Sequence, residues 1–484
     1  MNRHYFSVLS GPLTFLLVYL IPIAGLPYPA HVVLATFGWA VVWWILQPVP
    51  LGITSLLPLV IFPLFGLMNV SAVANQYGQS ILFWLMGTSL MGWALEKHGV
   101  AKRFALGLLS IRGVARTTSK VAFVYMLATA LLSFFISDLA AIAIAIPLGL
   151  SIASYVNSLI QKSESGTNNF AKLMVMAAFL GSVAGGMATI AGSAVNAISV
   201  SLLNAVTGTT IGWFEWMARG VPISLGLLVG FFLLLRWFFP PEERQIPGGE
   251  EFMRGELRKL GKWSRGESNV VGAFILMVVL FLIGPVSALV LGTRHFVALW
   301  LNQTLEIWIV PPIILFLLFL LPVDIQKREF TLHWKEAVEQ VPWSIILLTL
   351  SATVMMQSLG KFGFLEFMET VLAGFRITVW TLPLIALMFG FSSNFISAIA
   401  FTTLAGGIFL PAAVHAGFDT VTMAMMIPNL AIGVAWPWAG PTSATAFASG
   451  KVGIKDMIKV GLPATVVMVI VMSLVHTVFL SFQN

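Results

Sequence analysis

The sequence Ser133-Phe134-Phe135-Ile136-Ser137-Asp138 lies at the centre of a forty-residue stretch, Val121–Ile160, in which Asp138 is the one Asp, Glu, Lys or Arg. A membrane-spanning helix needs about 20 apolar residues, so this stretch is too long for a single span. It predicts either two full spans or a re-entrant hairpin followed by a span. A second long apolar stretch, Ile377–Gly417, contains none of these four residue types and has Ser393-Asn394 near its middle. The pair predicts a duplicated membrane unit.

The composition extends this membrane interpretation to the whole chain. Of the 484 residues, 58% are hydrophobic and 9% are charged, whereas soluble domains carry roughly 25% charged residues. The expected fold class is an all-α polytopic membrane protein with about 11 spans, with a duplicated unit and broken helices. This class excludes a soluble enzyme and a nucleic-acid reader. The lack of cysteine excludes thiolate metal sites and thiol nucleophiles.

One charged segment divides the chain into two halves of similar length. Thirteen of the charged residues lie between Arg236 and Glu267, and Pro240-Pro241 ends the preceding helix. A short helix is expected around Glu251–Lys262. Because Lys and Arg are retained on the cytoplasmic side, the segment is predicted to be cytoplasmic. The predicted units are a first membrane repeat with N-terminal helices at 1–235, a linker at 236–269 and a second membrane repeat at 270–484.

The apolar runs predict the positions of the helices. In the first half these are 11–26, 30–47, 51–66, 80–96, a hairpin and helix in 121–160, 172–203 with a break near Gly185–Asn196, and 219–238. In the second half they are 270–292, 304–321, 341–358, a hairpin and helix in 377–415, 420–448 with a break near Pro437–Pro441, and 460–482. The first helix follows Arg3 and His4 without a convincing cleavage site, so it is expected to remain uncleaved.

Four polar, glycine-rich or proline-rich stretches interrupt these spans. They are 133–138, 185–196, 392–394 and 437–443. Unwound backbone at membrane depth needs protein or water to satisfy it; its free carbonyls can coordinate a cation, and half-helix N-termini can hold an anion. Close packing at glycines, interhelical hydrogen bonds and proline kinks are structural alternatives. Asp138 is either the cap of a half-helix or the group that binds a coupling cation or carries a proton, since a mid-bilayer charge costs at least about 2.5–3.5 kcal/mol.

Several motifs resemble those of the divalent anion/sodium symporters, the family of dicarboxylate, citrate and sulfate carriers. The stretches are WWILQPVPLGITSLLP at 43–58, FPLFG at 62–66, the glycine- and threonine-containing stretch at 185–196, and the late stretch at 436–461 that ends GKVGIKDMIKVG. The resemblance covers most of the chain in matching order. It implies two re-entrant hairpins in an inverted-repeat fold, a homodimer, and a transport domain that moves against a scaffold as an elevator.

The resemblance and the interrupted spans together give the candidate site. For the substrate these residues are Ser137, Asp138, Ser393, Asn394 and Thr442. For a coupling cation, with sodium as the expected metal, they are Ser137, Asp138, Gly185, Gly186, Thr189, Gly192, Asn196, Ser393, Asn394, Pro437 and Gly440. The family carries Ser-Asn-Thr at each hairpin tip, whereas the tips here read Ser137-Asp138-Leu139 and Ser393-Asn394-Phe395. An ionised Asp138 would repel a dianion unless it holds a cation or is protonated.

Two functions are compatible with these features. The first is secondary active transport of an anionic solute (a di- or tricarboxylate, sulfate or a related organic anion) coupled to sodium or protons. The second is cation/proton antiport through Asp138. A membrane-embedded enzyme is disfavoured, because the seven histidines show no metal-ligand spacing and Asp138 has no acidic neighbour in its segment. No cofactor is expected apart from a sodium coupling ion. The expected partners are the solute, the bilayer and a second copy in a homodimer, with no nucleic acid, and the expected location is multi-pass in the plasma membrane (the inner membrane of a bacterium).

Overall fold

The computed structural model describes residues 3–159, 169–292, 294–305, 308–371 and 381–481. These residues are mostly helical, and eight of their helices are at least 18 residues long and apolar enough to cross a membrane. The described part contains one small sheet, an antiparallel pair of β1 (Pro322–Asp324) and β2 (Glu329–Phe330). The protein is an all-α polytopic membrane protein, as the composition predicted.

The helices of the first half follow one another with short connections. They are α1 (Arg3–Leu20), α2 (Tyr28–Leu46), α3 (Leu51–Thr54), α4 (Leu57–Leu64), α5 (Val70–Tyr77), α6 (Ser80–Lys97), α7 (Val100–Leu109), α8 (Thr118–Ser133), α9 (Asp138–Leu159), α10 (Asn169–Gly186), the 3₁₀ turn η1 (Ile190–Gly192), α11 (Ala194–Thr207) and α12 (Trp213–Phe238). The linker contains α13 (Gly249–Lys259), close to the short helix expected there.

The second half begins with α14 and ends with the longest helix, α24. Its helices are α14 (Arg265–Leu291), α15 (Phe296–Thr304), α16 (Val310–Leu320), α17 (Trp334–Gln340), α18 (Trp343–Lys361), α19 (Phe364–Val371), α20 (Leu382–Ser392), α21 (Ala398–His415), α22 (Thr420–Ala431), α23 (Pro441–Ala448) and α24 (Ile454–Ser481).

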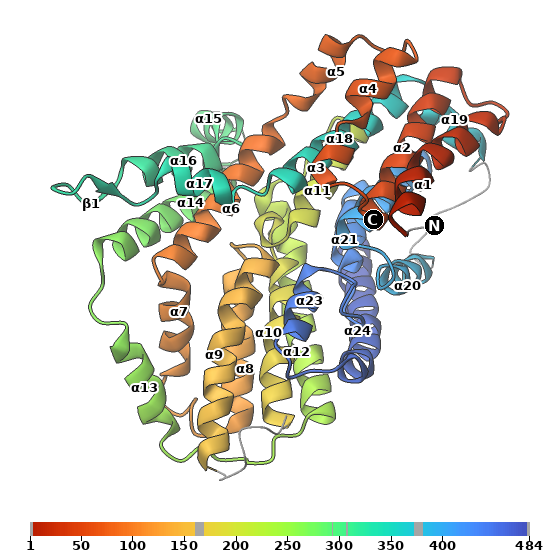
Figure 1. Cartoon of the computed structure of the whole chain (residues 1–484). Helices are drawn as coiled ribbons and strands as arrows, with labels where there is room; N and C mark the ends of the chain where they lie inside the picture. The colour runs from red at the N-terminus through yellow and green to blue at the C-terminus, as the bar shows by residue number, and fades with distance from the viewer. Residues whose placement is uncertain (1–2, 160–168, 293, 306–307, 372–380, 482–484) are drawn as a thin grey trace.

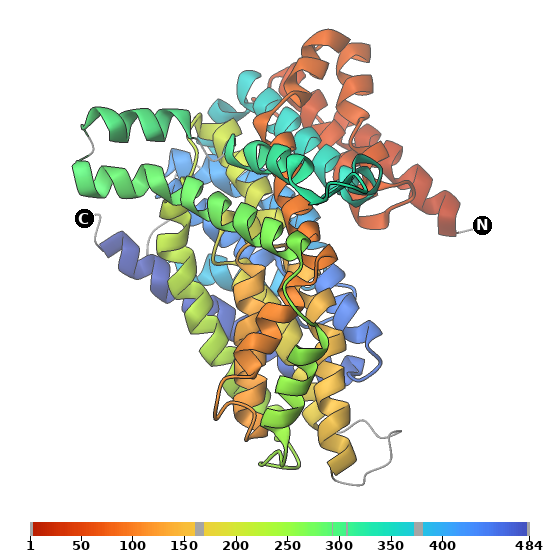
Figure 2. The same cartoon turned by 90° about the vertical axis from the view of Figure 1, so that its left-hand side faces the viewer.

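The helices form two groups in space. Figure 1 shows α1–α5 and α15–α19 together in the upper part, and α7–α10, α12, α13, α23 and α24 in the lower part. Helix α6 carries the chain from the upper to the lower group, and after the linker α14 returns it. Seen from the side, α14 and α15 extend away from the lower group, and the linker lies at the end of that group (Figure 2). Of the candidate site residues, Asp138 at the start of α9, Gly185 and Gly186 at the end of α10, and Thr442 in α23 belong to the lower group.

The same order of elements occurs twice. In α8–α12 a helix pair interrupted at 134–137 precedes a helix that unwinds after Gly186, resumes at Ala194 and is followed by a long helix. In α20–α24 the pair is interrupted at 393–397, and the next helix unwinds after Ala431 and resumes at Pro441. Each unwound segment also rests on a glycine of the long helix that follows it. A Cβ atom on Gly220 of α12 would lie 2.6 Å from the carbonyl oxygens of residues 187 and 188, and a Cβ atom on Gly461 of α24 would overlap the backbone of residues 434 and 435.

Close helix packing explains why the first of these units is rich in glycine. Helix α10 is buried along its whole length, and it packs against α8, α9 and α12. A Cβ atom on Gly181 would lie 2.7 Å from the carbonyl oxygen of Met126 in α8, and one on Gly185 would overlap the backbone of Ala130. Because these glycines lie four residues apart, they form one stripe along which α8 approaches α10.

The expected interruptions are found, and the differences lie mainly in short helices. The breaks at 134–137, 187–193, 393–397 and 432–440 fall in or beside the four polar stretches. The stretch predicted at 51–66 is two helices, α3 and α4, and the stretch at 304–321 is preceded by a separate short helix, α15. Helices α5, α7, α17 and α19 were not expected; each has ten or fewer residues. The predicted ends at 160 and 482 and the predicted start of the second hairpin at 377 lie outside the described residues.

Candidate functional site

The first hairpin tip is built by the start of α9. The Ser137 hydroxyl oxygen accepts a hydrogen bond from the backbone N–H of Ala140 at 3.3 Å, which is the side-chain contact of a helix N-cap. Asp138 is the first residue of α9, and its Oδ1 accepts the N–H of Leu139 at 2.9 Å. A carboxylate at this place interacts favourably with the positive end of the helix dipole. The sequence therefore starts a helix at Ser137-Asp138 in the middle of an apolar stretch.

The unwound segment between α10 and α11 lies directly against this tip. The Thr189 hydroxyl donates a hydrogen bond to the carbonyl oxygen of Phe134. A Cβ atom on Gly186 would lie 3.4 Å from the Cβ atom of Asp138, and one on Gly192 would lie 2.6 Å from the carbonyl oxygen of Ser133. A glycine is needed at 192 because the unwound segment and the tip touch there backbone to backbone, whereas the closest atom to a Cβ on Gly186 is the carbonyl oxygen of Gly192, at 3.1 Å.

Asn196 holds the unwound segment in shape. Its amide nitrogen donates hydrogen bonds to the carbonyl oxygens of Gly186 (2.8 Å) and Thr189 (2.9 Å). The side chain is fully buried, and its Oδ1 has no hydrogen-bond partner in the described part of the chain. A buried amide oxygen without a donor is a suitable ligand for a hard cation, which prefers carboxylate, carbonyl and amide oxygens.

Asp138 faces this segment without a cationic partner. Its Oδ2 accepts a hydrogen bond from the Ser193 hydroxyl at 3.2 Å, and Ser193 is the residue before α11. No Lys, Arg or His within the described ranges forms an ion pair with the carboxylate. Two hydrogen bonds from neutral donors leave the charge of an ionised carboxylate uncompensated at membrane depth. The site can therefore accept a cation or a proton.

The second hairpin tip uses an amide in a different way. The Oδ1 of Asn394 accepts the N–H groups of Val434 (3.0 Å) and Ala435 (2.8 Å) in the second unwound segment. Its Nδ2 donates to the carbonyl oxygen of Gly390 at 2.7 Å and to the hydroxyl of Thr465 in α24 at 3.3 Å. Asn394 is 1% exposed. Its side chain closes the tip onto the unwound segment, with its hydrogen bonds inside the protein.

The neighbouring candidate residues of the second half are likewise engaged in local structure. The Ser393 hydroxyl donates to the carbonyl oxygen of Gly390 at 3.0 Å. The Ser443 hydroxyl contacts the backbone of Gly440 and the carbonyl oxygen of Pro437, so it fixes the turn that leads into α23. Thr442, the second residue of α23, is buried.

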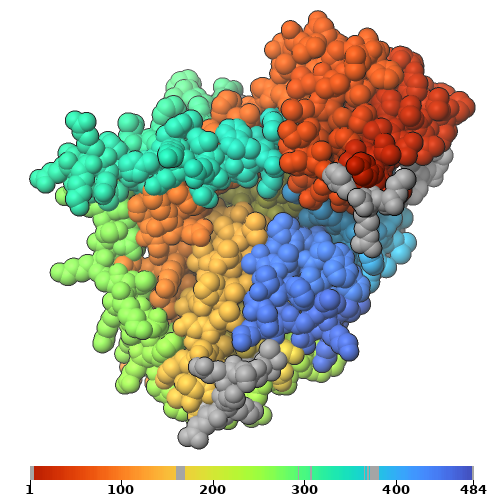
Figure 3. All heavy atoms as spheres, in the orientation of Figure 1, coloured from red at the N-terminus to blue at the C-terminus, as the bar shows by residue number. Residues whose placement is uncertain are grey.

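The two halves interlock around these segments. Helix α9, which begins at Asp138, packs against α23 of the other half, and α11 packs against α21. In Figure 3 the blue C-terminal segment lies against the yellow segment that includes α9. Each half thus places the second helix of its hairpin beside the resumed helix of the other half. The geometry brings together Asp138, Gly186, Thr189, Gly192 and Asn196 at the first tip. It joins Asn394 separately to residues 434 and 435.

Comparison with known proteins identifies the family. The model of the sodium:sulfate symporter transmembrane region matches residues 5–482. The chain belongs to this family. Its membership confirms the resemblance seen in the motifs and places the protein among multi-pass membrane transporters rather than enzymes.

Named relatives of this symporter family are similar over nearly the whole chain. The sodium-dependent dicarboxylate transporter SdcS of Staphylococcus saprophyticus is 28% identical over 483 residues, which cover 97% of this chain and 90% of the relative. SdcS of Staphylococcus aureus is also 28% identical, with the same coverage. A solved structure, the YdaH transporter of Alcanivorax borkumensis, has a TM-score of 0.53 at 12% identity and covers 94% of this chain and 99% of its own. That likeness concerns the fold alone.

Sequence reasoning missed two residues that complete the tips of this symporter-family protein. Ser193 donates to Asp138. It could have been found, since a serine directly before a resumed helix is a common N-cap residue. Thr465 accepts from Asn394, although it lies 71 residues away in α24. No local pattern marks it, because the contact depends on how α24 packs against α20.

Proposed function

We propose that this protein is a secondary active transporter that couples sodium entry to the uptake of a small divalent anion, of the dicarboxylate or sulfate class. Family membership and the names of the relatives, sodium-dependent dicarboxylate transporters, support the substrate class and the coupling ion. Cation/proton antiport through Asp138 is the alternative. Family membership in the sodium:sulfate symporters favours anion transport over it.

The observation that carries the proposal is the uncompensated carboxylate of Asp138 beside an unwound backbone. The carboxylate receives hydrogen bonds from Leu139 and Ser193 and has no cationic partner among the described residues. The buried Oδ1 of Asn196 in the first turn of α11, which also lacks a donor, supplies a second oxygen beside the unwound segment, because the amide nitrogen of Asn196 donates to the carbonyl oxygens of Gly186 and Thr189. A monovalent cation at this place would neutralise the carboxylate and allow an anion to bind nearby. Ser137, Gly186, Thr189 and Gly192 lie around this proposed cation site, and Gly185 holds the adjoining end of α10 against α8.

The anion would bind where half-helices begin. Helices α9, α11, α21 and α23 each start at an interruption of a membrane segment, and the start of a helix presents free N–H groups and a positive dipole end. Ser137 and Thr442 lie at the beginnings of α9 and α23. Ser393 and Asn394 shape the turn before α21. In this proposal, Asn394 positions backbone N–H groups and a cation site of the second half, with Pro437 and Gly440, rather than reaching the anion itself.

The arrangement of two helix groups suggests how such a solute would cross the membrane. We propose that the two interrupted units are inverted repeats, that the lower group of Figure 1 is the moving transport domain, and that the upper group is the scaffold of a homodimer. In an elevator mechanism the site moves with its domain while the scaffold stays in place. The repeated order of α8–α12 and α20–α24 supports this assignment.

Uptake into proteoliposomes tests coupling and site together. Radiolabelled succinate and sulfate are offered under an inward sodium gradient, an inward proton gradient, or neither, and the sodium concentration for half-maximal uptake is measured. We expect uptake under the sodium gradient. Asp138→Asn should raise the half-maximal sodium concentration about tenfold, the equivalent of about 1.4 kcal/mol of cation binding. Asp324→Asn, the same change in the half-buried strand β1 outside the candidate site, is the matched control and should take up the anion as the unaltered protein does.

Three outcomes would contradict this proposal. Uptake that depends on neither the sodium gradient nor the proton gradient would show that transport is not coupled to either ion. Uptake that follows the proton gradient and ignores sodium would assign Asp138 to a proton. Sodium-driven proton release without any anion, abolished by Asp138→Asn, would establish the antiporter instead.

A further inference from the structure

A deep apolar groove lies between the first hairpin and the start of the second half. Its volume is about 640 Å³, and it is lined by residues of α6, α7, α8, α13 and α14 and by Trp263 of the linker. Ligand pockets of roughly 300–1,000 Å³ accommodate small organic molecules. Twelve of its thirteen lining residues are apolar or glycine, and Arg103 is the exception. Water would find few hydrogen-bond partners in such a groove, so an apolar group is the expected occupant.

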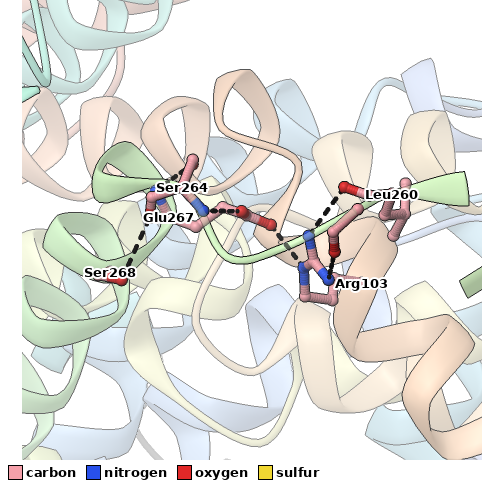
Figure 4. A network of polar contacts seen from close by, with 6 residues as sticks. Arg103, Leu260, Ser264, Glu267 and Ser268 are labelled. Carbon is pink, nitrogen blue, oxygen red and sulfur yellow. Dashed lines mark hydrogen bonds and ion pairs between the residues drawn. The ribbon is translucent and has the colours of Figure 1, made fainter. Parts of the chain in front are cut away.

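The one charge in the groove is already neutralised. Figure 4 shows the Arg103 guanidinium between the linker and α14. Its Nε donates to Glu267 Oε1 at 2.5 Å, and its two terminal nitrogens donate to the carbonyl oxygens of Leu260 and Gly261. The guanidinium carbon also lies 5.1 Å from the Trp263 ring centroid. Arg103 therefore builds the wall of the groove and does not select an anionic ligand.

Two cations lie close to Trp263, a lining residue, in the chain. Lys262 and Arg265 flank Trp263, and all three side chains are exposed. Neither Lys262 nor Arg265 takes part in an ion pair with another described residue. An apolar groove lined by an exposed tryptophan that has two cations without ion pairs close to it in the chain matches the polarity of a lipid, because tryptophan is typical of the headgroup level and basic residues attract anionic headgroups.

We infer that this groove is a binding site for an anionic diacyl phospholipid of the surrounding bilayer. One acyl chain would lie along the groove against Phe104, Leu132 and Ile275, and the phosphate would be placed beside Lys262 and Arg265. A chain that binds there contacts both the first hairpin and α14. A lipid that touches two packed elements stabilises the arrangement in which they are adjacent.

The groove also borders the first hairpin tip. Phe135 lines it and meets Phe274 of α14 edge to face, with ring centroids 4.9 Å apart. Phe135 precedes Ser137 by two residues and Asp138 by three. An occupied groove would therefore oppose separation of the first hairpin from α14. Lipid binding itself does not depend on the proposed transport function, whereas an effect of the lipid on uptake does.

Filling the groove gives the sharpest test. A Cβ atom on Gly107, which lines the groove in α7, meets no heavy atom within 4 Å, so Gly107→Leu should fold and occupy the space of the chain. Gly272→Leu is the matched control: Gly272 is also helical, its Cβ position is also open, and it does not line the groove. The protein is purified after exchange into vesicles of phosphatidylglycerol or phosphatidylcholine, and retained lipid is counted by native mass spectrometry. Melting temperature serves as the folding check.

We expect the unaltered protein and Gly272→Leu to retain phosphatidylglycerol in preference to phosphatidylcholine, and Gly107→Leu to lose the retained lipid. The double variant Lys262→Gln/Arg265→Gln should lower phosphatidylglycerol retention about tenfold and abolish the preference. Equal retention of the two lipids by the unaltered protein, or unchanged retention in well-folded Gly107→Leu, would overturn the inference. Loss of a dimer in Gly107→Leu with unchanged lipid would instead assign the groove to contact with a second copy.

Discussion

The two hairpin tips occupy corresponding places in α8–α12 and α20–α24, but their polar side chains are hydrogen-bonded in different ways. At the second tip, Asn394 gives its amide oxygen to two backbone N–H groups and its amide nitrogen to Gly390 and Thr465. At the first tip, Asp138 receives two neutral donors and keeps its charge uncompensated. The Asn394 side chain has its hydrogen bonds satisfied inside the protein. The Asp138 carboxylate, in contrast, needs a cation or a proton to neutralise its charge. Dependence on a coupling ion is therefore expected to reside at the first tip and stability at the second.

The largest expected effect comes from making the second tip resemble the first. Asn394→Asp would replace the donor that faces the Gly390 carbonyl with an oxygen and would bury a charge at a residue that is 1% exposed. An uncompensated buried charge destabilises by about 3–5 kcal/mol. Asp138→Asn should leave the melting temperature in sodium-free buffer unchanged or raised, because it removes a charge with no counterion. Thermal unfolding of both variants in detergent measures the contrast, and equal losses in the two variants would refute it.

The two halves can also be compared at α10 and α22, the helices that precede the two unwound segments. Both begin at an acidic cap: Asp419 accepts the N–H groups of Val421 and Thr422 before α22, and Glu242 accepts those of Asn169 and Phe170 at the start of α10. Asp419 also pairs at 2.8 Å with Arg219, which is buried, whereas Glu242 is exposed.

Removing the cap that is paired with the buried Arg219 should lower the free energy of unfolding more than removing the exposed cap. Asp419→Ala leaves the Arg219 guanidinium buried without its partner, at a cost of about 3 kcal/mol, and Glu242→Ala should cost less. The double variant Arg219→Met/Asp419→Ala is the control, since it should recover part of the loss by removing the stranded charge. Chemical denaturation in detergent provides the values. If Glu242→Ala is as harmful as Asp419→Ala, burial does not distinguish the two caps.

A smaller effect is expected from removing one hydroxyl group at each tip, and it distinguishes a contribution to cation binding from a contribution to stability. Ser193→Ala and Thr465→Val each remove one hydroxyl that contacts the tip residue, at 3.2 Å and 3.3 Å respectively. Each should cost about 1–2 kcal/mol of stability. Only Ser193→Ala should also change the sodium concentration that gives half-maximal uptake, because Ser193 touches Asp138. A sodium response that shifts equally in both variants would show that the two tips bind the ion jointly.

The smallest expected effect concerns the linker at the base of the first hairpin. Hydrogen bonds from the Gly113 N–H and from Arg116 lower the pKa of Glu250. A carboxyl whose folded pKa is lowered stabilises docking above its ordinary pKa, and this contribution is lost as the pH falls through the lowered value. Glu250→Gln should make the linker slightly easier to cleave by protease at neutral pH, and the difference from the unaltered protein should vanish in acid. A difference that persists in acid would assign it to packing rather than charge.

Local sequence predicted the interruptions of the fold better than the contacts between them. Ser137-Asp138, the glycines around Gly186 and Pro441 mark helix starts and breaks through short-range rules, and the structure places its breaks there. Short helices such as α7 lack the length of a span and give no comparable hydropathy signal. The Arg219–Asp419 pair joins residues 200 positions apart, and such a contact is set by packing that a single sequence does not encode locally.

The hydrogen bonds of the linker have a mechanical consequence. The N–H of Ile246 donates to the carbonyl oxygen of Arg116, and the carbonyl oxygen of Leu260 accepts from Arg103, so the linker is fastened at both ends to the segment around α7. The carbonyl oxygen of Gly261 also accepts from Arg103, so residues 262–264 remain between this attachment and α14, which Arg103 also contacts through Glu267. Three extended residues reach roughly 10–11 Å. A larger displacement of the first hairpin relative to α14 would have to break the hydrogen bonds that hold the linker. Arg103 therefore limits the distance that the first hairpin can move.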